Sequence, residues 1–234
     1  MPKSALTTRL ERLARREQLV GHEFFRNARH APLTHAGVAV ILGQWWHPLH
    51  FFPRFLARAV SVLPDIASQC AITKILYQET GEGDPQRAHE VIYVDTMASA
   101  GFTPEETTMA APFAETEALV AGYARAAENR FTALGFIFAT EVADLAMVSG
   151  IGAAVARVAG TRDLPWVRIH VDQEPDHVKE ADHTMHSFAA GEEALVVDSA
   201  EEMWQLWLAF FDRLQAEAFA APLEPNGVRS AVSV

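Results

Sequence analysis

Apolar residues recur along the chain mainly at intervals of three and four, the period of amphipathic and buried α-helices. Residues 5–28 place leucines three or six positions apart, with arginine and glutamate between them, and predict an amphipathic helix. Further helices are expected over 35–61, 63–79, 85–99, 113–132, 134–158, 172–188 and 199–219, with a turn-rich loop over 101–112. Two short runs, 91–94 and 194–197, are ambiguous between strand and helix. Seven or eight helices with short connections predict an all-α bundle.

Prolines and glycines interrupt this helical pattern at defined points. Pro48 and Pro53 fall inside the second predicted helix, where each removes a backbone donor, so a kink or a break is expected there. Gly81 and Gly83 end the helix that precedes them, because glycine allows the chain to turn sharply. Pro85 then suits the first turn of the next helix.

Length and charge narrow the range of functions. The 234 residues contain no repeat and no low-complexity linker, so we expect one helical domain over 1–222 and a flexible tail over 223–234. The formal net charge of −11 argues against binding to nucleic acid or to an anionic membrane. The single cysteine, Cys70, excludes an intrachain disulfide and a cysteine-based zinc site. The N-terminus lacks a signal-peptide pattern, so a cytoplasmic protein is expected.

Residues 135–155 are nearly all apolar, and their only charged members are Glu141 and Asp144. A helix that is apolar all round lies in a protein core. A carboxylate there costs on the order of several kcal/mol unless it is paired, protonated or bound to a metal. Two acids near the middle, and no second such segment, argue against a membrane span. Glu141 is therefore either a metal ligand or the partner of a basic residue on a neighbouring helix.

His170, Glu174 and His177 have the spacing i, i+4, i+7, which places them within about 60° of one another on a helical face. Imidazole and carboxylate groups that converge from one helical face build metal sites in bundles, and this set suits iron, manganese or zinc. A solvated polar face is the alternative. Pro175 is tolerated best in a first turn, which makes Asp172 the expected N-cap of this helix.

A third group of candidates surrounds the glycine turn. Glu79 ends one predicted helix, and His89 falls in the first turns of the next. Glu82, seven residues before His89, is the alternative to Glu79, and a capped, solvated helix end is the alternative to a metal site. By helical arithmetic, His183 and His186 point away from the metal-binding face and are expected at the surface.

The three segments together supply three carboxylates and three imidazoles, from Glu79, His89, Glu141, His170, Glu174 and His177. Such a set can hold two metal ions, with carboxylates bridging and histidines terminal. Oxygen-rich ligands with imidazole and no thiolate favour iron or manganese over structural zinc.

At these residues the sequence resembles the haem-oxygenase-like diiron oxidases and oxygenases, often described as iron-containing redox enzymes. Their pattern is an acidic pair before Gly-x-Gly, a His about ten residues on, a Glu within a later apolar helix, and then H-x3-D/E-x2-H. Here Glu79 and His89 are ten residues apart, and Glu141 and His170 are 29 apart. The resemblance spans about residues 35–190.

This resemblance implies a seven-helix haem-oxygenase-like bundle that uses two Fe(II) ions and O2. It also implies oxidation of a small amine- or carboxylate-bearing molecule, such as an amino acid or a fatty acid. The outcomes known in the family include N-oxygenation, desaturation, decarboxylation and oxidative C–C cleavage. Residue spacing assigns neither the substrate nor the outcome.

The sequence departs from the family pattern at four points, one of which is Pro175 inside the last motif. Gln78 replaces the first acid of the acidic pair, and Glu174 stands where Asp is commoner. Some members carry a further carboxylate from another helix, but residues 35–61 contain no acid at all. The polar candidates for a further ligand in that segment are Gln44, His47 and His50.

Two aromatic clusters each allow two interpretations. One cluster either lines a pocket beside the site or, as we favour, belongs to the core: Trp45, Trp46, Phe51, Phe52 and Phe55. The other, on the last predicted helix, either forms a homodimer contact or belongs to the core: Trp204, Leu206, Trp207, Phe210 and Phe211.

Two other classes of function compete with the diiron interpretation. One is a metal-free enzyme of the same bundle shape, resembling the thiaminase-like or pyrroloquinoline-quinone-forming branches. A thiaminase-like enzyme would need a nucleophilic cysteine in its pocket, and Cys70 lacks an obvious activating neighbour. The other is a non-catalytic binding protein whose histidines and acids form a satisfied polar core.

Overall fold

The computed structural model describes residues 3–186 and 188–220. Its elements are eleven α-helices and two 3-10 turns, with no strand among the described residues. The helices are α1 (Ala5–Leu10), α2 (Ala14–Val20), α3 (Glu23–His30), α4 (His35–Val62), α5 (Ile66–Glu79), α6 (His89–Ser99), α7 (Pro104–Thr108), α8 (Ala114–Ala126), α9 (Arg130–Ala159), α10 (Pro165–His183) and α11 (Ala190–Ala218). The 3-10 turns are η1 (Pro85–Arg87) and η2 (Thr184–His186). The predicted domain end at residue 222 and the predicted tail over 223–234 lie outside the described residues.

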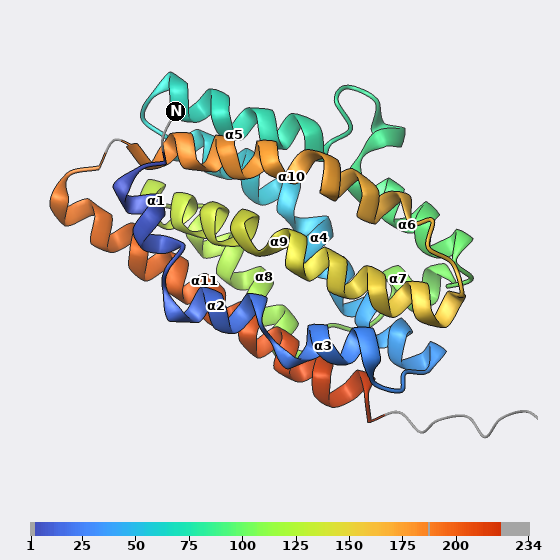
Figure 1. Cartoon of the computed structure of the whole chain (residues 1–234). Coiled ribbons are helices and arrows are strands. Elements are labelled where there is room, and N and C mark those ends of the chain that lie inside the picture. The colour runs from blue at the N-terminus through green and yellow to red at the C-terminus, as the bar shows by residue number, and fades with distance from the viewer. Residues whose placement is uncertain (1–2, 187, 221–234) are drawn as a thin grey trace, which may run out of the picture.

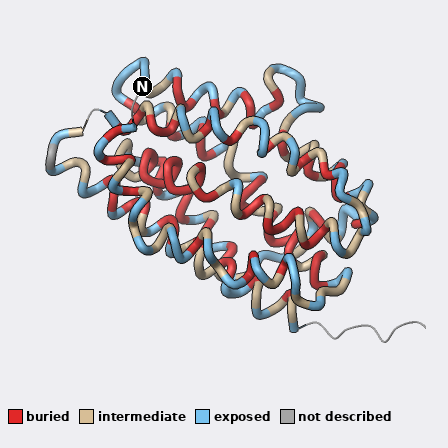
Figure 2. Tube along the Cα trace, viewed as in Figure 1, coloured by how far each residue is buried: buried red, intermediate tan, exposed pale blue. Residues whose placement is uncertain are grey.

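Seven of the helices in this part of the chain have eleven or more residues, namely α4, α5, α6, α8, α9, α10 and α11. The predicted all-α, seven-helix bundle is therefore confirmed. Helix α9 runs through the middle and contacts α11, α10, α3 and α4 (Figure 1). Buried residues concentrate along this central helix and on the faces that surround it (Figure 2).

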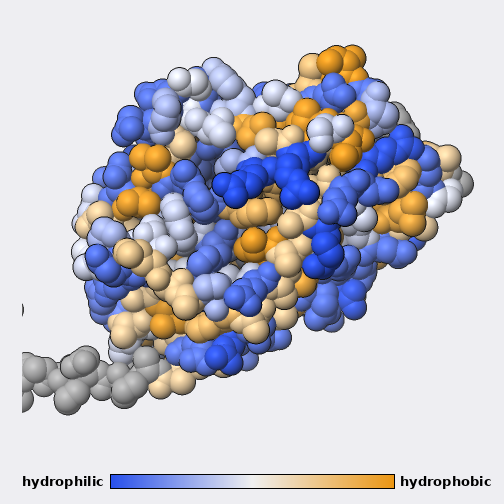
Figure 3. All heavy atoms as spheres, turned by 180° about the vertical axis from the view of Figure 1, so that it is seen from behind, coloured by the Kyte–Doolittle hydropathy of each residue, from blue (hydrophilic) through white to orange (hydrophobic). Residues whose placement is uncertain are grey.

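Helix α9 combines a very apolar sequence with a buried position. It is the one helix in the described ranges that is long and apolar enough to cross a membrane, and 67% of its most apolar window is buried inside the protein. Packing on several sides accounts for this composition. Seen from behind, the molecular surface shows hydrophobic residues in separate small groups among hydrophilic ones (Figure 3).

Close packing of α9 against α11 depends on Gly135. A Cβ atom at this position would lie 2.6 Å from the carbonyl oxygen of Val196 and 2.7 Å from the Cβ of Ser199. The backbone of α11 would have to move, and overpacking of this kind costs about 1–3 kcal/mol.

We expect Gly135→Ala to lower the free energy of unfolding by about this amount, measured by denaturant titration. Gly191→Ala is the matched control: its Cβ meets nothing within 4 Å, and we expect stability to be unchanged or slightly higher. Equal stability of the two variants would contradict this account.

The predicted helix over 5–28 is wrong, because the structure divides it into α1, α2 and α3. A side-chain cap marks the second break, where His22 accepts a hydrogen bond from the backbone of Phe24 at the start of α3. The first break has no such cap, because Leu13 is the N-cap of α2. Leu10 and Leu19 are nevertheless fully buried. The apolar spacing therefore indicated the buried face correctly but not the helix ends.

Several other helices differ from the expected ones. Helix α4 continues without a break through Pro48 and Pro53. The expected loop over 101–112 contains α7, which a capping box between Thr103 and Glu106 initiates. Helices α10 and α11 begin earlier than expected, at Pro165 and Ala190. The ambiguous runs 91–94 and 194–197 are both helical.

The aromatic cluster of α11 belongs to the core of the chain itself. Trp204, Trp207, Phe210 and Phe211 are all at most 2% exposed. The indole nitrogen of Trp204 also donates a hydrogen bond of 2.9 Å to the carbonyl oxygen of Ala139 on α9. These side chains are therefore not available as a dimer contact, and homodimer formation stays a prediction without an assigned surface.

Candidate metal centre

Helix α10 presents His170, Glu174 and His177 on one buried face. All three residues are at most 5% exposed, whereas the intervening Pro175 is exposed. The expected N-cap at Asp172 is wrong, because α10 begins at Pro165 and Leu164 is its N-cap. Pro175 therefore lies inside the helix and leaves one backbone carbonyl without its helical donor. This carbonyl belongs to Val171, which is half exposed, so water can replace the missing donor.

A tight turn after α5 returns the chain to the site. Gly81 has a φ of 89°, and a Cβ there would lie 2.1 Å from the carbonyl oxygen of Asp84, so only glycine fits. Glu79, the last residue of α5, thereby faces His89, the first residue of α6, with 3.0 Å between Oε2 and Nδ1. Glu82 instead forms a 2.6 Å ion pair with Arg87, away from the cluster. Of the two alternatives, Glu79 is the one placed at the site.

Glu141 comes from the central helix α9 and is 2% exposed. The alternative of a basic lysine or arginine partner is wrong. Its Oε2 instead lies 3.3 Å from Nδ1 of His177 on α10. The charged residue in the apolar helix therefore faces the candidate site, which explains how it can be buried.

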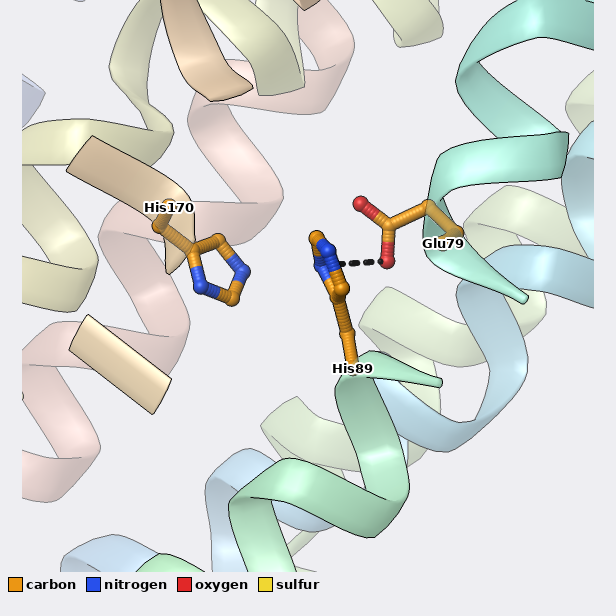
Figure 4. A group of neighbouring side chains, drawn as sticks. All are labelled: Glu79, His89 and His170. Carbon is orange, nitrogen blue, oxygen red and sulfur yellow. Dashed lines mark ion pairs between the residues drawn. The ribbon is translucent and has the colours of Figure 1, made fainter. Parts of the chain in front are cut away.

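The six predicted residues form two adjacent buried triads. Glu79, His89 and His170 form the first, in which the imidazole of His89 lies between the other two side chains (Figure 4). The second triad contains Glu141, Glu174 and His177. Within each triad, one ligand atom per residue lies within 4.8 Å of the others.

The carboxylate of Glu79 lies between the two triads. Its Oε2 faces His89 at 3.0 Å, and its Oε1 lies 3.8 Å from Nδ1 of His177 in the second triad. One carboxylate that faces both groups is suited to bridge two metal ions. The arrangement therefore fits a dinuclear centre better than two independent sites.

Several polar atoms of the cluster are buried without a hydrogen-bond partner in the described residues. They are His89 Nδ1, Glu141 Oε1, Glu174 Oε1 and His177 Nε2. Native proteins rarely leave buried polar atoms unpaired, because each costs about 1–3 kcal/mol. Lone pairs on imidazole and carboxylate are the donors that iron and manganese accept. The residues present thus fit a pair of such ions.

Hydrogen bonds to the outer nitrogens set the orientation of two imidazoles. Nδ1 of His170 donates to the carbonyl oxygen of Trp166 at 2.7 Å, which leaves Nε2 free. Nε2 of His89 lies 2.9 Å from Oε1 of Gln173, so donation there leaves Nδ1 free, on the side of Glu79. Partners of this kind fix the tautomer that a metal needs.

Replacement of Gln173 tests the tautomer argument. We expect Gln173→Ala to weaken Mn(II) binding by about 10–100-fold, because His89 loses the acceptor that holds Nδ1 in its binding form. Gln173→Glu keeps an acceptor and should restore most of the affinity. Calorimetric titration measures both, and equal affinities for wild type and Gln173→Ala would refute the assigned role.

Burial and charge pairing displace the pKa values of the cluster in opposite directions. Burial raises the pKa of Glu79, but the neighbouring His89 and His177 outweigh it and hold this pKa at about 2. Burial lowers the pKa of His177, but Glu141 outweighs it and raises this pKa to about 9. Burial, assisted by His89, lowers the pKa of His170 to about 4, so this imidazole is neutral at pH 7. Burial also raises the pKa of Glu174 well above its usual range.

A small cavity adjoins the cluster, and members of both triads contribute to its wall. Apart from the carboxyl group of Asp144 and two hydroxyl groups, the remaining wall is apolar or aromatic, and it consists of Trp45, Pro48, Leu49, Phe52, Tyr123, Thr140, Asp144 and Trp207. Trp45 and Phe52 thus line the pocket, whereas Phe55 is buried in the core. The hydroxyl groups of Tyr123 and Thr140 bond to each other at 2.9 Å.

Several sequence candidates lie away from this centre. Gln44 bonds to the backbone of Ala111 and Phe113, and His47 to that of Ala110, so neither is a further ligand. His50 pairs with Glu90 at 2.6 Å on the surface.

The remaining histidine and cysteine candidates are also outside the cluster. His183 and His186 pair with Glu180 and Asp182, and their side chains are 32% and 37% exposed, in agreement with the predicted surface position. Cys70 is exposed and does not line the cavity, which removes the nucleophile that a thiaminase-like enzyme would need.

Sequence reasoning gave no role to Asp144, which the structure places at this centre. Its carboxyl group lines the same cavity as both triads. The available signal was its position three residues after Glu141 in an otherwise apolar segment. One helical turn carries both acids to neighbouring faces of α9.

Comparison with solved structures defines the class of the fold. The chain is similar to a CadD-like protein of unknown function from Nostoc punctiforme, with a TM-score of 0.75, 13% identity, and coverage of 94% of this chain and 97% of that one. It is also similar to a TenA homologue from Pseudomonas syringae, with a TM-score of 0.73, 15% identity, and coverage of 92% of this chain and 94% of that one. A third similar structure is a domain with a haem-oxygenase-like fold from Shewanella denitrificans, with a TM-score of 0.71, 17% identity, and coverage of 86% of this chain and 88% of that one. At these identities the likeness shows the fold, which is haem-oxygenase-like.

The sequence narrows this class to a family. Residues 40–208 match the model of the iron-containing redox enzymes, and the chain belongs to this family. None of the curated proteins compared with the chain matches it. The family resemblance inferred from the ligand spacing is therefore confirmed.

Proposed function

We propose that this chain is a non-haem diiron oxidase or oxygenase that uses two Fe(II) ions and O2 to oxidise a small amine- or carboxylate-bearing metabolite. The observation that carries the proposal is Glu79, whose carboxylate faces both buried triads. Membership of the iron-containing redox enzymes supports iron as the metal. The proposed ligands are Glu79, His89, Glu141, His170, Glu174 and His177.

Bound ferrous iron would supply the electrons for the reduction of O2, which ordinary side chains cannot do. The chain supplies position and surroundings. Gln173 and the carbonyl of Trp166 orient His89 and His170. The apolar wall of the cavity limits access of water to the reacting groups.

The cavity wall constrains how a substrate would bind. Trp45, Phe52 and Trp207 offer an apolar surface, and neither lysine nor arginine is among the lining residues. A hydrocarbon or aromatic portion of the substrate is therefore expected to occupy the cavity. N-oxygenation, desaturation and oxidative C–C cleavage are all compatible with such a site. No specific observation favours the metal-free alternative.

Oxygen consumption tests the proposed function. The protein is loaded anaerobically with Fe(II), mixed with O2, and monitored with an oxygen electrode and by visible absorbance in the presence of amino acids and fatty acids. We expect iron-dependent O2 uptake that at least one class of compound accelerates. The same uptake from chelator-treated protein, or none from iron-loaded protein with any compound, would overturn the proposal.

A cytoplasmic location and the absence of nucleic-acid and membrane partners stay predictions.

A further inference from the structure

A fourth carboxyl group lies at the edge of the two triads. Asp144 follows Glu141 by one helical turn on α9 and lines the same cavity. Its Oδ2 is buried and has no hydrogen-bond partner in the part of the chain that the structure describes. Neither triad includes Asp144, so the six proposed ligands do not account for it.

The carboxyl group of Asp144 faces a proposed ligand from the neighbouring helix. Asp144 on α9 and Glu174 on α10 line the same cavity. Two carboxylates that face one enclosed space repel each other unless a proton or a cation lies between them. Glu174 Oε1 is itself buried without a partner. Both groups therefore present a lone pair that a cation could accept.

Charge balance points the same way, on the assumption that the proposed diiron function is correct. The triads contain three carboxylates, which leave one positive charge uncompensated on a pair of ferrous ions. Net charge is costly in a buried site. A fourth ionised carboxylate would make the filled centre neutral, and Asp144 is the carboxyl group placed to provide it.

We propose that Asp144 is a seventh metal ligand, and that its carboxylate binds the ion held by Glu141, Glu174 and His177. That ion then has three carboxylates and one imidazole of its own, the other has two imidazoles, and Glu79 faces both. The centre is asymmetric, and its oxygen-rich half is suited to a hard ion such as Mn(II) or Fe(II).

Titration with Mn(II), followed by the loss of the free-ion EPR signal, tests this assignment. We expect wild-type protein to bind two Mn(II) ions. Asp144→Asn should weaken the affinity for one of these ions by about 10–100-fold and leave the affinity for the other unchanged. Asp182→Asn is the matched control. Asp182 is a buried aspartate at the end of α10, and its carboxylate accepts a hydrogen bond from Thr7 on α1 instead of lining the cavity. This variant should retain both ions.

A crystal structure of Mn(II)-loaded wild-type protein tests the same inference without a variant. We expect an Asp144 oxygen at about 2.2 Å from one ion. An Asp144 oxygen beyond about 3 Å, or an Asp144→Asn variant that binds both ions like wild type or loses both equally, would overturn the assignment. In those cases the wild type still binds two ions, so the diiron proposal survives. Wild-type protein that binds none would overturn both.

Discussion

Glu141→Gln is expected to reduce binding from two metal ions per chain to one or fewer. Glu141 supplies a carboxylate to the second triad from the central helix, and its Oε1 is buried without a partner. The amide has nearly the same volume but no charge, so α9 can keep its packing while the ion loses a ligand. Iron per chain, measured by elemental analysis after anaerobic loading and gel filtration, reports the effect.

Helix content and a distant carboxylate provide the controls for this variant. Circular dichroism of Glu141→Gln should match that of wild type. Glu201→Gln removes a carboxylate that pairs with Arg15 at 2.6 Å, away from the cavity, and should leave the iron count unchanged. Two tightly bound ions in Glu141→Gln would show that Glu141 is not a ligand.

Metal binding is expected to stabilise the whole fold strongly. The cluster joins the end of α5, the start of α6, α9 and α10, so an ion bound there links four helices. An ion present at 1,000 times its Kd adds about 4 kcal/mol to the free energy of unfolding. For a chain of this length, that corresponds to a rise in Tm of about 8–16 °C.

Thermal unfolding monitored by circular dichroism, with and without Mn(II), measures this rise. Excess chelator should reverse it, because the ion stabilises only while it is bound. Glu141→Gln should show at most about half of the wild-type rise. An unchanged Tm for wild-type protein in saturating Mn(II) would show that the ion does not bind to the folded cluster.

Helical periodicity predicted the face shared by the candidate ligands of α10 because helix geometry is local. The spacing of His170, Glu174 and His177 fixes one face of any helix that contains them, whatever the rest of the chain does. The structure confirms that this face is buried. The start of α10 was missed because Pro175 was expected in a first turn, whereas its exposed position tolerates it inside the helix.

Tertiary contacts decided the features that periodicity missed. The choice between Glu79 and Glu82 depends on how the turn at Gly81 folds back, and the left-handed backbone at Glu82 directs its side chain to Arg87. The role of Asp144 depends on the distance between α9 and α10, which neither helix encodes alone. Spacing along one helix therefore predicted which side chains share a buried face, whereas proximity between helices could not be predicted in this way.

The most direct test of the two-metal centre is the number of ferrous ions that bind to the folded chain. Anaerobic titration of chelator-treated protein with Fe(II), followed by removal of free iron and elemental analysis, gives this number. The account predicts two ions per chain, because Glu79 faces both triads. One ion, or none, would contradict a dinuclear centre at these six residues.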